Sequence, residues 1–157
     1  MLKVTLIESI LRGLPETILF VWAIYLLTQT PMKYSKIILT ASISTFITFI
    51  IRLLPINLGI NSILSLALLI YLNIKINKIP IKQSISTTIL VIIIEYIAEM
   101  LNIVMLQLLK FDIVKLFQNP VNKVLYALPS LVLLVIIVLI VHNIKTKYWS
   151  LKSNKIV

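Results

Sequence analysis

The sequence of 157 residues contains no cysteine, two glycines, one histidine and five acidic residues. Without cysteine it can form no disulfide, no thiolate metal site and no cysteine nucleophile. Two glycines cannot build a glycine-rich phosphate loop, and one histidine cannot complete an HExxH zinc motif. Asp112 is the single aspartate, which excludes an intramembrane aspartate pair. We therefore expect no enzyme activity, no metal and no cofactor.

Charged residues are also scarce, at 13% of the chain, whereas 60% of the residues are hydrophobic and the mean hydropathy is +1.08. Ordinary soluble domains are roughly 45–50% apolar and about 25% charged. The composition therefore predicts an integral membrane protein. The net charge of +10 does not indicate nucleic-acid binding, because the lysines lie in short connections, where basic residues orient membrane helices and meet anionic headgroups.

Apolar runs divide the chain into membrane-spanning candidates, each near the roughly 20 residues that a helix needs to cross a bilayer. The sequence predicts one domain over residues 1–157, an all-α polytopic transmembrane helical bundle of about five spans. A short basic cytoplasmic tail, 143–157, follows the last span. The expected spans are 6–28, 35–54, 57–74, 84–108 and 126–142.

The first span contains Pro15, directly after Gly13 and Leu14. Proline lacks the backbone N–H and clashes with the preceding turn of a helix. We expect this span to be kinked at Pro15, or to begin as a partly re-entrant segment.

The segment 108–123 between the last two spans has an amphipathic pattern. Leu109, Ile113, Leu116 and Phe117 fall at i, i+4, i+7 and i+8, which is one face of a helix. This pattern predicts a helix lying in the membrane interface. A lid that contacts a ligand is the alternative.

Basic residues at and beyond the ends of the spans divide unequally between the two sides of a five-span protein. Excess lysine and arginine mark the cytoplasmic side, so we expect a multi-pass protein of the cell membrane with the N-terminus outside and the C-terminus in the cytoplasm. One side carries Lys3, Arg52, Lys110, Lys115 and Lys123, and the other carries Lys33, Lys36, Lys75, Lys78, Lys82, Lys145, Lys147, Lys152 and Lys155.

Four of the five acidic residues, Glu8, Glu16, Glu95 and Glu99, lie within apolar segments. A carboxylate in hydrocarbon costs a few kcal/mol or more, so it normally persists only when it is paired, faces a polar cavity or has a function. Helix alternation brings most of the intramembrane polar groups to one half of the membrane, the outer half under the expected sidedness. The predicted ligand-binding or ion-pair cluster there contains Arg12, Glu16, Arg52, Asn57, Asn61, Glu95, Glu99 and Asn102.

Polar residues also repeat at helical spacing on four of the five spans, for example Thr40, Ser44, Thr48 and Arg52. One interpretation is that these stripes join the helices through close packing and hydrogen bonds. The other is a functional polar pocket that opens outward. We expect Arg52 and Glu99 to approach one another. The fifth span is almost free of polar residues and is expected to be the most exposed to lipid.

The segments ESILRGLPETILFVWAIYLLT and FIIRLLPINLGINSIL resemble small membrane proteins of anaerobic, spore-forming Gram-positive bacteria. These proteins in turn look like the N-terminal membrane-embedded sensor regions of quorum-sensing-type histidine kinases. The printed chain carries no phosphoacceptor helix and no ATP-binding domain, so the resemblance implies a sensor or adaptor that signals through another protein. The matching positions are Arg12, Gly13, Leu14, Pro15, Glu16, Arg52, Leu53, Leu54, Pro55, Ile56 and Asn57.

The leading hypothesis is therefore a signal-sensing or regulatory membrane module. It would bind a small or peptide-like ligand, or a partner helix, through the polar cluster. Arg12 and Arg52 would attract an anionic group, whereas Glu16, Glu95 and Glu99 would bind a cationic group or hold the arginines in place. Besides the lipid bilayer, the partner could be a histidine kinase, another membrane protein or a second copy of the chain. The alternative is a small transporter or the substrate-binding subunit of a multi-component importer.

Overall fold

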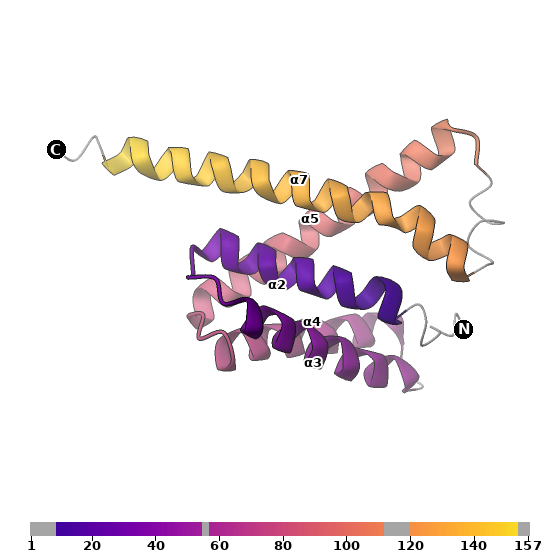
Figure 1. Ribbon diagram of the computed structural model, residues 1–157, viewed down its shortest axis with the longest axis horizontal. Coiled ribbons are helices and arrows are strands. Elements are labelled where there is room, and N and C mark those ends of the chain that lie inside the picture. The colour runs from indigo at the N-terminus through magenta and orange to yellow at the C-terminus, as the bar shows by residue number, and fades with distance from the viewer. Residues whose placement is uncertain (1–8, 55–56, 112–119, 154–157) are drawn as a thin grey trace.

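The computed structural model describes residues 9–54, 57–111 and 120–153, and these residues form helices and no strand. Four of the helices are long and apolar enough to cross a membrane, and a fifth apolar helix is shorter. The protein is thus a membrane-embedded helical bundle (Figure 1). Its elements are the π-helical turn η1 (Ser9–Gly13), α2 (Leu14–Thr28), α3 (Tyr34–Leu53), α4 (Leu58–Lys75), α5 (Ile81–Leu108) and α7 (Pro120–Ser153).

Helix α2 lies at the centre of the bundle, in contact with α3, α5 and α7. Its second half is almost completely enclosed, and Val21, Ala23 and Ile24 have no exposed surface. Helix α7 packs against α2 and α5, on the opposite side of α2 from α3 and α4 (Figure 1). Because lipid is as apolar as the side chains, close packing rather than exclusion of water holds such helices together.

Small and hydroxyl-bearing side chains mark the helix contacts of α3 and α5. Thr40 and Ala41 of α3 and Ser84 and Thr88 of α5 are fully buried. Small residues let helix backbones approach closely in a membrane, where they can also form hydrogen bonds. These positions therefore agree with the packing interpretation of the polar stripes.

Pro15 does not interrupt the helix at the start of the chain. Residues Leu11–Thr28 form one helical stretch, in which a π-helical turn precedes the α-helix. In a regular helix the amide of residue 15 would donate to the carbonyl of Leu11, and proline has no N–H to give. The wider turn directly before Pro15 accommodates this missing bond, as π-bulges do in other helices.

The end of α5 agrees with the sequence expectation, and the start of the C-terminal tail does not. Helix α5 ends at Leu108, and Lys110 adopts a left-handed conformation with φ of 59°. Residues 112–119, which carry most of the expected interfacial helix, lie outside the described residues. At the other end, α7 continues past His142 to Ser153, so most of the expected tail is helical.

Helix α7 is also less exposed than its sequence suggests. In its most apolar stretch 33% of the residues are buried inside the protein, against 22% for α3. Side chains such as Leu134 and Val138 are buried, in the same core cluster as residues of α2 and α5. The expectation that the least polar helix is the most lipid-exposed was wrong, because apolar side chains can pack against α2 and α5 as readily as against lipid.

Candidate functional site

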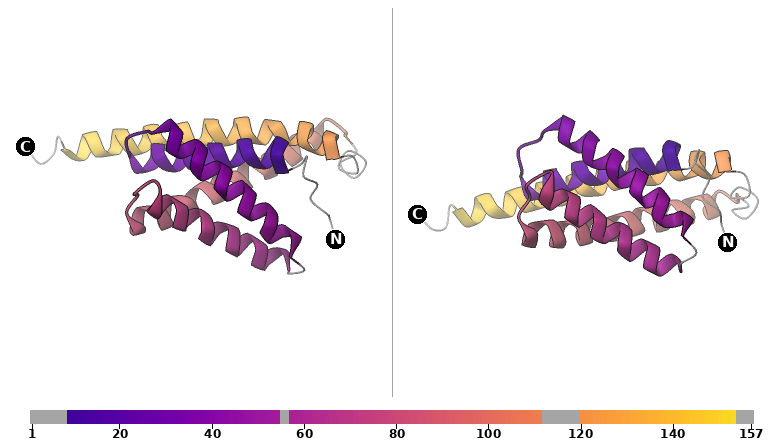
Figure 2. Two further views of the ribbon diagram at one scale, coloured as in Figure 1. Left: turned by 60° about the horizontal axis from the view of Figure 1, so that its bottom comes forward. Right: turned by 90° about the horizontal axis from the view of Figure 1, so that it is seen from below.

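A cavity lies within a ring of four helices. Contacts run from α2 to α3, from α3 to α4, from α4 to α5 and from α5 back to α2. Toward the end of the bundle where η1 lies, α3 and α4 diverge from α2 and α7 (Figure 2). The cavity has a volume of about 440 Å³, and residues of η1 and all four ring helices line it.

Six of the eight residues that the sequence nominated line this cavity: Arg12, Glu16, Arg52, Asn61, Glu95 and Glu99. The other two lie elsewhere. Asn57 is exposed directly before α4, where its backbone carbonyl accepts a hydrogen bond from the backbone N–H of Asn61. Asn102 is buried between helices, and its side-chain amide donates to the carbonyl of Tyr126 at 2.9 Å. Asn102 therefore joins α5 to α7.

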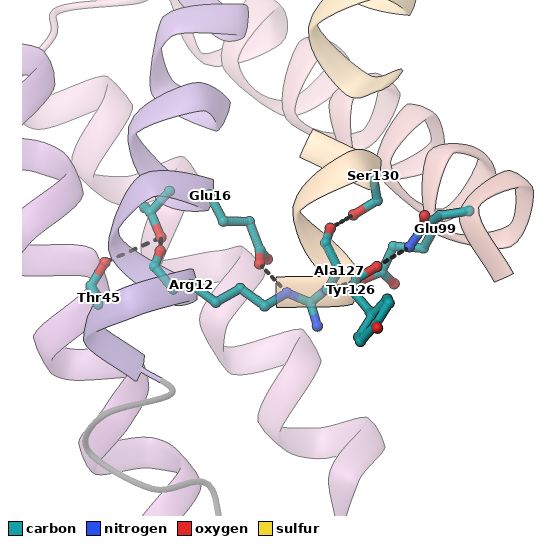
Figure 3. A network of polar contacts seen from close by, with 10 residues as sticks. Arg12, Glu16, Thr45, Glu99, Tyr126, Ala127 and Ser130 are labelled. Atoms are coloured by element: carbon teal, nitrogen blue, oxygen red, sulfur yellow. Dashed lines mark hydrogen bonds and ion pairs between the residues drawn. The ribbon is translucent and has the colours of Figure 1, made fainter. Parts of the chain in front are cut away.

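Arg12 is the charged centre of the cavity wall. Its Nε lies 3.3 Å from a carboxylate oxygen of Glu16, one turn further along the chain. Its terminal nitrogen donates to Glu99 of α5, so one guanidinium joins two carboxylates from different helices (Figure 3). All three side chains keep a fifth to a third of their surface exposed. The pairs are therefore only partly removed from solvent.

Arg52 does not take the partner that we expected. Among the described residues, Glu99 forms its ion pair with Arg12, and Arg52 forms no ion pair. The Arg52 residue is exposed at the last turn of α3, yet it lines the same cavity. The expectation relied only on the similar depth of Arg52 and Glu99 in the membrane. In the structure the π-helical turn brings Arg12 to Glu99 instead.

Glu95 is the carboxylate of this wall that lacks a cation partner in the described part of the chain. It lies one helical turn before Glu99 and close enough to Glu16 and Glu99 for mutual charge repulsion. Arg12 is also near enough to attract it. The carboxyl group of Glu95 is also hydrogen-bonded to that of Glu16, so three acidic side chains share the field of one guanidinium in this part of the cavity.

Hydroxyl groups connect the arginine turn to α3. The Thr17 hydroxyl donates to the carbonyl of Gly13 at 2.6 Å, and the Thr45 hydroxyl donates to the Thr17 oxygen at 3.2 Å (Figure 3). Threonine commonly bonds back to the carbonyl four residues earlier in a membrane helix. These two bonds hold the turn that carries Arg12 against the middle of α3.

The remaining wall combines polar and apolar surface. Ser65 donates to the carbonyl of Asn61 at 2.9 Å, so its own hydrogen is used within α4. Asn61 is only 6% exposed, and its side-chain oxygen has no hydrogen-bond partner in the described residues. The apolar part of the lining comes from Phe20, Phe49, Leu66, Leu69 and Ile92.

The other end of the ring is closed by a buried hydrogen-bond network that the sequence analysis missed. Asn77 accepts from the Tyr25 hydroxyl at 2.9 Å and from the Thr40 hydroxyl at 3.2 Å, and it donates to Asn73 at 2.7 Å. All four residues are at most 4% exposed. Asn73 lies in the last turn of α4 and Asn77 lies two residues beyond its end. Their four-residue spacing was the signal that could have identified the network.

Comparisons with protein families, with curated proteins and with solved structures found no match to this chain. The resemblance to sensor regions thus rests on the two quoted segments alone. The described residues also contain no group of three or more histidine, cysteine, aspartate or glutamate side chains arranged to hold a metal ion. A functional assignment therefore has to be based on the cavity and on the charged residues that line it.

Proposed function

We propose that the chain is a multi-pass cell-membrane sensor module that binds a small or peptide-like ligand in the four-helix cavity and signals through a partner protein. The observation that supports this most is the cavity of about 440 Å³ lined by charged groups from η1, α2, α3 and α5. Ligand sites in proteins typically measure about 300–1,000 Å³ and combine an apolar wall with a few polar groups. Ionisable residues within a membrane mark functional sites by default.

In this proposal all five helices cross the membrane. Helix α4 has 18 residues and is therefore about 27 Å long at 1.5 Å per residue. That length approaches the roughly 30 Å of the hydrocarbon core. Helix α4 also packs between α3 and α5 as a full member of the ring, which favours a span over a re-entrant segment.

The sidedness in the proposal follows from the lysines at the closed end of the ring. Lys36 donates to the carbonyl of Ile76 at 2.9 Å, and Lys145 donates to the carbonyl of Leu27 at 2.7 Å. Lys75, Lys78 and other basic residues belong to the same end. Because basic residues favour the cytoplasmic side, this end is assigned to the cytoplasm and the cavity to the outer half of the membrane.

Signal transmission would use the ion pairs of Arg12. A charged ligand beside these pairs changes the forces on η1 and on α5, which α2 and α7 contact. Only differential binding to two arrangements of these helices can shift their equilibrium. The partner would then bind the arrangement that the ligand favours. A histidine kinase, another membrane protein or a second copy of the chain could fill this role.

The test is to fill the cavity and follow the cellular response. Ser65→Phe places a large side chain on the cavity wall, and Ser42→Phe makes the same change at an exposed position of α3 outside the lining. Each variant complements a deletion strain of the native host, and the transcript profile is compared with that of the wild type. We expect Ser65→Phe to abolish the gene-dependent response and Ser42→Phe to preserve it. If both variants insert into the membrane and both give the wild-type transcript profile, the sensor proposal is refuted.

A small transporter, or the substrate-binding subunit of an importer, is the second candidate. Glu95 and Glu99 favour it, because adjacent carboxylates within a membrane can bind a proton or a cation during transport. The same strains distinguish the two. Loss of accumulation of a labelled solute in Ser65→Phe cells, with an unchanged transcript profile, would indicate transport.

A further inference from the structure

Two side chains on the wall of the cavity can still accept hydrogen bonds. Glu95 is hydrogen-bonded to Glu16 but has no cation partner in the described residues. The buried side-chain oxygen of Asn61, on the neighbouring helix α4, has no donor in the described residues. Carboxylates accept hydrogen bonds and do not donate them when ionised. A ligand that completes this wall must therefore bring donors.

The charges of the wall point the same way. Glu16, Glu95 and Glu99 contribute three acidic groups to the lining, and Arg12 and Arg52 contribute two guanidiniums. Arg12 already contacts Glu16 and Glu99, and Arg52 is exposed at the last turn of α3. Acidic side chains therefore outnumber basic ones in the lining by three to two. The guanidinium of Arg12 is itself a planar organic cation with several N–H groups, and it contacts two acidic side chains of this wall. The wall can therefore bind such a group.

A bare metal ion fits the wall poorly. Divalent ions such as Ca²⁺ need six to eight oxygen atoms at about 2.3–2.6 Å from one point. The described residues contain no such convergence of acidic side chains. Organic cations have less strict requirements, because their N–H groups point in several directions and reach acceptors at about 2.7–2.9 Å.

Resting on the proposed ligand-binding function, we infer that the ligand is an organic cation with a primary ammonium group. The ammonium binds Glu95, with Asn61 as an additional acceptor. The apolar body of the ligand lies against Phe20, Leu69 and Ile92, which line the same cavity. Ammonium has three donors and no acceptor, so it matches the acceptor atoms of Glu95 and Asn61. Arg12 holds Glu16 and Glu99 in place and does not leave them.

The experiment uses the full chain in nanodiscs of zwitterionic lipid, so that anionic headgroups do not compete for the probe. The probes are butylammonium, benzylammonium and 2-phenylethylammonium, each with the neutral alcohol of the same shape as its partner. Binding is followed by saturation-transfer NMR and by the shift of the unfolding temperature. We expect at least one ammonium probe to bind, and its alcohol to bind about tenfold or more weakly, because a charge-assisted hydrogen bond is lost.

Two variants locate the ammonium group. Glu95→Gln keeps the shape of the side chain and removes its charge, and should weaken the ammonium probe about tenfold or more. Lys75→Gln removes one charge at the opposite end of α4 and should leave the affinity unchanged. If no ammonium in the series binds, if alcohols bind as tightly, or if Glu95→Gln has no effect, the inference is overturned.

The outcome for the ligand class is separable from the outcome for the proposed function. If Ser65→Phe abolishes the cellular response and Glu95→Gln leaves it intact, the cavity is a site but its ligand is not a cation. If Ser65→Phe leaves the response intact, the cavity is not the sensing site and the proposed function itself fails.

Discussion

Arg12 and Glu99, 87 residues apart in the sequence, form an ion pair between the π-helical turn and α5. The pair closes the ring of helices on the side where α2 meets α5. Glu16 holds the same guanidinium at 3.3 Å, so Arg12 is supported from both sides. This arrangement explains how two glutamates and an arginine can be kept together inside an apolar bundle.

Arg12→Gln should therefore destabilise the protein. Removing one partner of a buried ion pair typically costs about 3–5 kcal/mol, and partial exposure of these side chains reduces this to roughly 1–3 kcal/mol. Thermal unfolding of the purified protein in detergent measures the loss. The double variant Arg12→Gln/Glu99→Gln should recover part of it, because one unpaired carboxylate is removed as well.

Arg52→Gln is the matched control for that measurement. Arg52 is exposed and has no ion pair among the described residues, so its replacement should change stability by less than about 0.5 kcal/mol. A loss as large as that of Arg12→Gln would mean that Arg52 neutralises the glutamates as much as Arg12 does.

The closed end of the ring should be sensitive to Asn77. Asn77→Ala leaves the Tyr25 hydroxyl and the Asn73 oxygen without the partners they have now, and unsatisfied buried groups cost about 1–3 kcal/mol each. Tyr25→Phe removes a single bond and should cost only about 0.6 kcal/mol, the average for such bonds between membrane helices. Equal losses in thermal unfolding for both variants would contradict a network centred on Asn77.

Much of the bundle could be predicted from the sequence, because its determinants are local. Apolar length predicts helices, and the four-residue spacing of polar groups identifies the faces that line the cavity, including Glu95 and Glu99. The pairing of Glu99 with Arg12 could not be predicted, since depth along a helix says nothing about the widening of the turn before Pro15. Asn73 and Asn77 were missed because asparagine near a helix end is usually a turn signal.

The absence of cysteine makes the proposed sidedness directly testable. Asn57→Cys and Lys78→Cys each introduce one thiol at an exposed position, at opposite ends of α4. A membrane-impermeant maleimide should label Asn57→Cys in intact cells and Lys78→Cys only after permeabilisation, because excess lysine marks the cytoplasmic side. The wild-type chain provides a background without label. Labelling of Lys78→Cys alone in intact cells would reverse the topology, and labelling of both would show that α4 does not span.

Asn102 provides a test of which nominated residues belong to the site. It lies on the same stripe of α5 as Glu95 and Glu99, yet its amide donates to the Tyr126 carbonyl and it is not part of the cavity lining. Asn102→Ala should therefore lower the free energy of unfolding by about 0.6–1.7 kcal/mol, the range measured for hydrogen bonds between membrane helices. It should leave the binding of ammonium probes unchanged, whereas Glu95→Gln should weaken binding with little loss of stability. If Asn102→Ala weakens the probes as much as Glu95→Gln does, the ligand reaches past the cavity toward α7, and the boundary drawn between the site and the α5–α7 contact is wrong.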